Sequence, residues 1–154
     1  GVLISLFFLA IMLPGLFIDK IIVRLKQNVN LVSLGLVCAG LLCVGIFRGK
    51  AMLVVGALLA GFGYGVMQPV VYDKAATIAP PRSATLALSF VMAMNYLAVM
   101  VCPFIVDLFR HLFHTHSDRF PFFFNAASVL VMVIVTWRYR GNFTLGLDES
   151  YYKS

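Results

Sequence analysis

The sequence predicts an all-α membrane protein built as a bundle of five spanning helices. Its composition is 62% hydrophobic and only 12% charged, with a mean hydropathy of +0.97, whereas soluble domains average about 25% charged residues. Five long apolar runs are separated by short polar connections. Each run is close to the ~20 residues that a helix needs to cross about 30 Å of hydrocarbon. We therefore treat the bilayer as the solvent of this chain.

The five predicted helices cover residues 1–18, 31–47, 51–72, 84–109 and 120–137. The first begins at Gly1, inside an apolar run, without the charged start and cleavage site of a signal peptide. We therefore expect a truncated start, with this chain as the C-terminal part of something longer. The second and third runs carry no charge, and the fourth contains Asp107 near its end. The fifth ends at the interfacial aromatic residue Trp137.

Charges in the connections predict the orientation, because cytoplasmic connections carry an excess of Lys and Arg. Alternate connections share a side, which places eight basic residues on one side and four on the other. The eight are Lys20, Arg24, Lys26, Lys74, Arg82, Arg138, Arg140 and Lys153, and the four are Arg48, Lys50, Arg110 and Arg119. The bundle at 1–137 is therefore expected to precede a cytoplasmic tail at 138–154 in a plasma (inner) membrane. We therefore interpret the net charge of +6 as an attraction to the anionic lipids of the cytoplasmic leaflet, rather than as a sign of nucleic-acid binding.

One connection carries a family signature. Gly15, Asp19, Lys20 and Arg24 stand in a spacing that resembles the G-x-x-x-D-[RK]-x-G-x-R loop of the major facilitator superfamily. In that family the loop links helices two and three, and a weaker copy links helices eight and nine. Ile22 replaces the second glycine of the signature, which suits the weaker copy.

Later segments resemble the same family. Residues 61–69, Gly-Phe-Gly-Tyr-Gly-Val-Met-Gln-Pro, are similar to its helix ten, and the Pro80-Pro81-Arg82 turn is similar to its loop between helices ten and eleven. The resemblance implies that the five runs are helices eight to twelve of a twelve-helix secondary transporter. Such a protein works by alternating access about a central site, here against a missing N-terminal bundle.

Polar side chains inside the third and fourth runs predict a substrate cavity. Tyr64, Gln68 and Tyr72 recur every four residues, and Asn95 and Tyr96 lie near the middle of the next run. An unpaired amide is costly in lipid, so Gln68 must face protein or water. The resemblance implies that helices eight, ten and eleven line the cavity. The alternative interpretation is a single Gln68–Asn95 hydrogen bond between helices, worth typically ~1 kcal/mol.

The signature loop suggests a gate. Asp19 could accept hydrogen bonds from a neighbouring helix N-terminus or pair with Arg24, and the resemblance implies that such contacts latch the two bundles together. The alternative is a basic cluster at Lys20 and Arg24 that only fixes topology.

Small residues in the third run predict close packing or a hinge. Gly61 and Gly65 follow Ala57 at four-residue spacing, which lets two helix backbones approach. Pro69 comes next in this series and should kink the helix. Plain helix packing is the simpler interpretation, and a hinge for the rocking motion is the functional one.

The outer end of the fourth run holds the remaining candidates. Asp107 and Arg110 are three residues apart, a helical pairing distance, so we expect a structural ion pair or outer-gate contact. Proton coupling at Asp107 is the alternative. His111, His114 and His116 could together bind a transition metal, but interfacial loop histidines are commoner, and we predict no metal site.

These features predict secondary transport of a small, neutral or amphipathic organic solute. The resemblance is closest to drug or sugar efflux members, and both export and import remain open. Because the sequence shows no nucleotide site, we expect a proton or sodium gradient to supply the energy. No catalytic residues or cofactor are expected, and Cys38, Cys43 and Cys102 are interpreted as small buried hydrophobes. Two alternatives remain open: a non-transporting scaffold subunit, and a metal-dependent membrane enzyme using the histidine loop.

Overall fold

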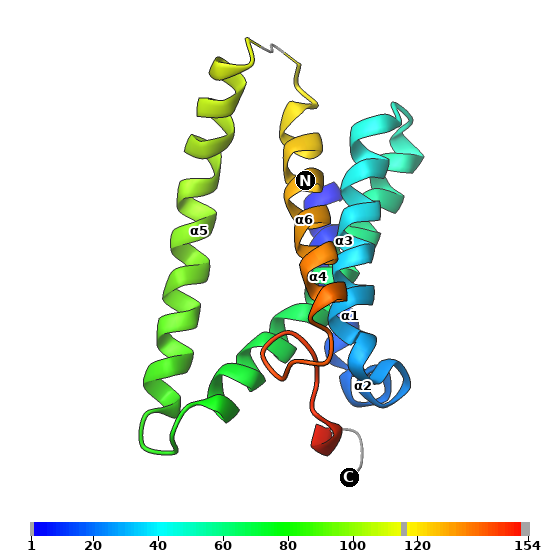
Figure 1. Cartoon of the computed structure of the whole chain (residues 1–154). Coiled ribbons are helices and arrows are strands. Elements are labelled where there is room, and N and C mark those ends of the chain that lie inside the picture. The colour runs from blue at the N-terminus through cyan, green and yellow to red at the C-terminus, as the bar shows by residue number, and fades with distance from the viewer. Residues whose placement is uncertain (1, 115–116, 152–154) are drawn as a thin grey trace. The chain divides into compact units, whose positions relative to one another are not determined.

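The structure, a computed structural model, describes residues 2–114 and 117–151, and within these ranges it contains helices and turns but no strand. Gly1, His116 and Lys153 are named in the predictions above and lie outside the described residues. The helices are α1 (Val2–Gly15), α2 (Ile18–Leu25), α3 (Val29–Ile46), α4 (Lys50–Ile78), α5 (Ala84–Leu112) and α6 (Phe120–Arg138) (Figure 1). Two short 3-10 turns, η1 (Lys26–Asn28) and η2 (Glu149–Tyr151), complete the described secondary structure.

Four helical segments in the described part of the chain are long and apolar enough to cross a membrane. They are Ile18–Ile46, Lys50–Ile78, Ala84–Leu112 and Phe120–Arg138. A fifth apolar helix, Ile4–Gly15, is shorter. The predicted all-α membrane bundle is confirmed, and its count of five spans is approximate.

Two connections predicted as loops are helical. Within 19–30, α2 forms because Ile18, Ile21, Ile22 and Leu25 make an apolar stripe at helical spacing. The third predicted helix, which we ended at residue 72, continues to Ile78. Its last turns contain polar residues that tolerate a helix, and the first strong breakers come at Pro80 and Pro81. The prediction from hydropathy therefore found the end of the apolar segment, whereas the helix itself continues into polar residues.

The chain divides into two compact units, residues 1–68 with 122–154 and residues 69–121. Glycines hold the helices of the first unit together. A Cβ added to Gly40 would lie 2.6 Å from the Gly56 carbonyl oxygen, and one added to Gly63 would lie 2.5 Å from the Ser33 carbonyl oxygen. Because no side chain separates the backbones there, α3 and α4 pack in direct contact.

The last helix and the tail also pack within the first unit. Cys38 on α3 donates from Sγ to the Ala126 carbonyl on α6 at 3.7 Å. After α6 the chain folds back, and Asn30 Nδ2 donates to the Leu145 carbonyl at 2.7 Å. Leu147 is only 3% exposed. The tail is therefore docked on the start of α3, where Figure 1 draws it in orange and red.

The second unit contains the end of α4, all of α5 and the turn that leads into α6. Along α5 only Val106 is buried among the described residues. Leu86 and Phe104 are 75% and 73% exposed. Exposed apolar surface on this scale requires lipid or another protein surface as its environment.

Candidate functional site

The second unit brings two predicted cavity residues together. Asn95 Nδ2, on α5, donates to Tyr72 Oη, on α4, at 3.5 Å, the long limit for such a bond. Both side chains are half-buried, whereas Tyr96, next to Asn95, is 70% exposed. A phenol and an amide thus lie side by side within two apolar helices, and both can donate to or accept from a polar solute.

The other two predicted cavity residues belong to the first unit. Tyr64 and Gln68 are half-buried on α4, one turn apart. The spacing places them on the stripe that continues to Tyr72, as the sequence predicted. The convergence of all five residues on one cavity stays a prediction, as does the Gln68–Asn95 hydrogen bond.

The glycine ridge of α4 lies against α1. A Cβ on Gly61 would come within 2.8 Å of the Phe7 carbonyl oxygen, and one on Gly65 would overlap the Ile11 carbonyl oxygen. Pro69 follows inside the same helix, and the division into two units falls between Gln68 and Pro69. This geometry accounts for the small residues by packing, and it leaves the hinge at Pro69 as a prediction.

The signature residues lie at the end of α1 and on α2. Gly15 is the last residue of α1, and a Cβ there would meet nothing within 4 Å. Asp19 is in the first turn of α2 and Arg24 in its last turn. Positions five apart do not share a helix face, so α2 does not favour an Asp19–Arg24 pair, whereas Lys20 and Arg24 do share a face. The latch stays a prediction.

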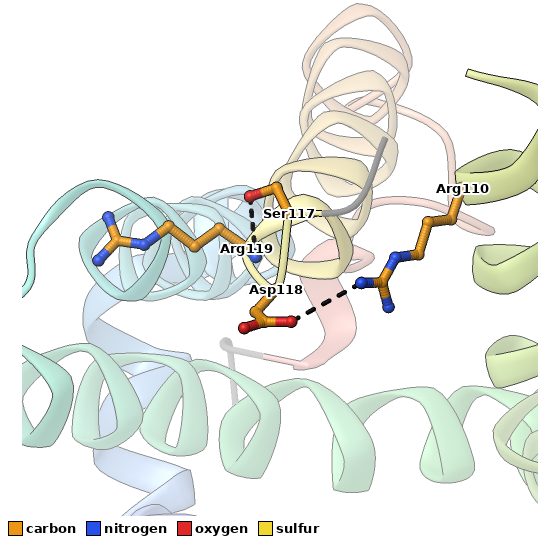
Figure 2. Close-up of polar contacts among 4 residues, drawn as sticks. All are labelled: Arg110, Ser117, Asp118 and Arg119. Atoms are coloured by element: carbon orange, nitrogen blue, oxygen red, sulfur yellow. Dashed lines mark hydrogen bonds and ion pairs between the residues drawn. The ribbon is translucent and has the colours of Figure 1, made fainter. Parts of the chain in front are cut away.

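At the far end of α5 the charged residues have partners other than the predicted ones, and Figure 2 shows the partner of Arg110. Arg110 Nη2 lies 3.7 Å from Asp118 Oδ1, and Asp107 Oδ2 lies 3.7 Å from His111 Nε2. The Arg119 amide donates to Ser117 Oγ at 3.3 Å, which orders the turn carrying Asp118. Arg110 therefore lies beside this turn in a solvent-exposed ion pair, which contributes little to stability. The direct Asp107–Arg110 pair stays a prediction.

Among the described residues no group of three His, Cys, Asp or Glu side chains is arranged to hold a metal ion. His111 and His114 are described, whereas His116, the third member of the proposed cluster, lies outside the described residues.

Lys74 is a candidate that the sequence reasoning missed. Its side chain is 5% exposed, and within the described part of the chain Nζ has no hydrogen-bond partner. We placed Lys74 in a connection because the apolar run ends at Tyr72. The uninterrupted stretch from Tyr72 to the first proline, Pro80, was the signal that the helix continues past it.

An apolar pocket of about 400 Å³ opens in the first unit. Its walls come from α1, α3, α4 and the start of α6, and they include Phe7, Gly40, Gly56 and Phe122. It contains none of the predicted cavity residues and offers no polar side chain to orient a solute.

The family of the chain follows from a comparison with family models. The model of the Major Facilitator Superfamily matches residues 1–149. The chain belongs to the major facilitator superfamily. Members of this superfamily are membrane transporters that bind small-molecule substrates, and they are not enzymes. No curated protein and no solved structure gives a significant match.

Membership in the major facilitator superfamily decides between two of the classes left open by the sequence. The family places the chain among membrane transporters, which agrees with its long apolar helices. The alternative of a metal-dependent membrane enzyme is excluded. The motifs at 15–24 and 61–69 that suggested this superfamily lie inside the matched range.

Proposed function

We propose that this chain is the C-terminal bundle, helices eight to twelve, of a secondary transporter that moves a small organic solute by alternating access. In this proposal the chain rocks against an N-terminal bundle of the same protein about a central cavity. The Tyr72–Asn95 contact is the observation that carries it, because it joins α4 and α5 through polar groups that can also bind a solute.

The chemistry of these residues supports a neutral or amphipathic solute. Phenol and amide groups offer hydrogen bonds and aromatic faces without a net charge. The proposed substrate class is a drug-like compound or a sugar, with efflux as the direction that the motif resemblance favours. A proton or sodium gradient would supply the energy.

The distribution of basic residues supports the proposed orientation. The alternation of the predicted connections assigns eight of the twelve Lys and Arg residues to the side that includes the tail, with Lys74 among them buried near the end of α4. Cytoplasmic connections carry this excess, so we place the C-terminus in the cytoplasm and the protein in the plasma (inner) membrane.

The scaffold alternative is separated from transport by Gln68→Ala and Asn95→Ala. In cells expressing the full gene, efflux or uptake of a panel of neutral and amphipathic compounds is measured beside the amount of protein in the membrane. The transport proposal predicts altered flux at a normal protein level. Lower protein levels with every flux unchanged would support the scaffold alternative.

A further inference from the structure

A basic pocket of about 650 Å³ lies in the first unit, and none of the proposed cavity residues lines it. Its volume is within the ~300–1,000 Å³ typical of small-ligand sites. It is lined by Arg24, Leu25, Lys26, Gln27, Asn28, Arg140 and Glu149. Residues from the α2–α3 junction and from the tail therefore share one concave surface.

The fold brings these distant segments together. Asn30, at the start of α3, donates to the Leu145 carbonyl 115 residues away, and Leu147 is buried nearby in the tail. On the other wall, Lys26 has a positive φ of 51° between α2 and η1. A lysine rarely adopts this conformation, and it turns the backbone sharply where the pocket forms.

The charge of the pocket suits an anion. Its lining includes three basic residues, Arg24, Lys26 and Arg140, and one acidic residue, Glu149. Guanidinium groups bind phosphate oxygens through two parallel hydrogen bonds, and the Gln27 and Asn28 amides add further donors. Phosphate fits this set of donors better than a cation or a neutral solute does.

The position of the pocket identifies the source of the phosphate. Its residues directly precede α3, which begins at Val29, and follow α6, which ends at Arg138. The pocket residues 24–28 form the polar part of the segment Ile18–Ile46, before its apolar helix α3 begins. The start of α3 and the end of α6 therefore lie beside the pocket, at the depth where lipid headgroups lie. We propose that this pocket binds the phosphate group of an anionic phospholipid headgroup.

The test measures binding of short-chain phosphatidylglycerol, phosphatidylcholine and inorganic phosphate to the detergent-purified protein. Phosphatidylglycerol is expected to bind at least about tenfold more tightly than phosphatidylcholine. The double variant Arg24→Gln/Arg140→Gln should lose about tenfold or more of this binding, since each surface cation adds several-fold. Inorganic phosphate should bind far more weakly than phosphatidylglycerol.

The matched control is Arg82→Gln/Arg138→Gln, which removes the same charge from the same predicted side outside the pocket. Glu149→Gln removes the competing carboxylate and should tighten phosphatidylglycerol binding several-fold, so a poorly folded double variant still leaves a test. The proposal would be overturned if the two lipids bound equally well, or if the control variant lost as much phosphatidylglycerol binding as the pocket variant. Weaker phosphatidylglycerol binding by Glu149→Gln would also overturn it. Inorganic phosphate binding as tightly as phosphatidylglycerol would overturn the lipid as its source.

Discussion

At the scale of single residues, the contact between Tyr72 and Asn95 joins two of the predicted cavity residues through polar groups. Its length of 3.5 Å implies a weak bond that a solute can replace at little cost. A cavity residue needs this property, because a strong internal partner would compete with the substrate.

Tyr72→Phe tests that contact. It removes the hydroxyl that accepts from Asn95 Nδ2, so we expect a loss of about 0.5–1 kcal/mol in the free energy of unfolding. Thermal unfolding in detergent measures the change for Tyr72→Phe, Asn95→Ala and the double variant. The double variant should lose less than the sum of the single losses, and strictly additive losses would argue against the contact.

Lys74→Met tests the cost of the buried ammonium. Because Nζ is buried without a hydrogen-bond partner in the described part of the chain, an apolar side chain of similar length should stabilise the protein by on the order of 1 kcal/mol or more. Lys20→Met is the control, since Lys20 is exposed on α2 and should change stability by less than about 0.5 kcal/mol. A lower unfolding temperature for Lys74→Met would show that a partner outside these residues binds it.

At the scale of elements, α4 is the helix on which most of the site depends. It carries the glycines that contact α1 and α3, the aromatic and amide stripe, and Pro69. One surface of α4 therefore packs against α1 and α3, and another carries the residues of the predicted cavity.

Gly65→Ala tests the packing surface. The new methyl group would overlap the Ile11 carbonyl of α1, so the helices must separate, at a cost of about 1–3 kcal/mol. Gly35→Ala is the matched control, because a Cβ on Gly35 meets nothing within 4 Å and alanine favours a helix. The unfolding temperature should therefore fall for Gly65→Ala, and it should stay the same or rise for Gly35→Ala. The same fall in both variants would contradict direct α1–α4 packing.

Pro69→Ala tests the hinge. Alanine restores the backbone donor and removes the clash with the preceding turn, so α4 should become straighter and at least as stable. If Pro69 serves the rocking motion, the initial transport rate should fall severalfold while the unfolding temperature holds or rises. An unchanged rate would leave Pro69 with a packing role alone.

The sequence predicted these elements well where apolar runs are bounded by prolines or charges, as for α5 and α6. It failed at α2 and at the end of α4, because both are helical beyond the apolar surface. The cavity stripe on α4 follows from helical periodicity. The Asp107–His111 pair has i,i+4 spacing within α5, so helical periodicity could have indicated it. The Arg110–Asp118 pair and the tail contact at Asn30 instead depend on how the chain folds back beyond one helix, which local patterns do not encode.

At the scale of the whole molecule, the account rests on alternating access to the cavity residues. Residues that line such a cavity must meet water from each side of the membrane in turn. Residues that face lipid should be accessible to water from neither side of the membrane. This difference is testable without knowing the substrate.

The decisive measurement is labelling of Asn95→Cys by a membrane-impermeant maleimide, applied from each side separately, with Cys38, Cys43 and Cys102 replaced by alanine. Phe104→Cys is the control, because Phe104 is 73% exposed on the apolar surface of α5. The account predicts labelling of Asn95→Cys from both sides and of Phe104→Cys from neither. Protection of Asn95→Cys from both sides would contradict alternating access at this site.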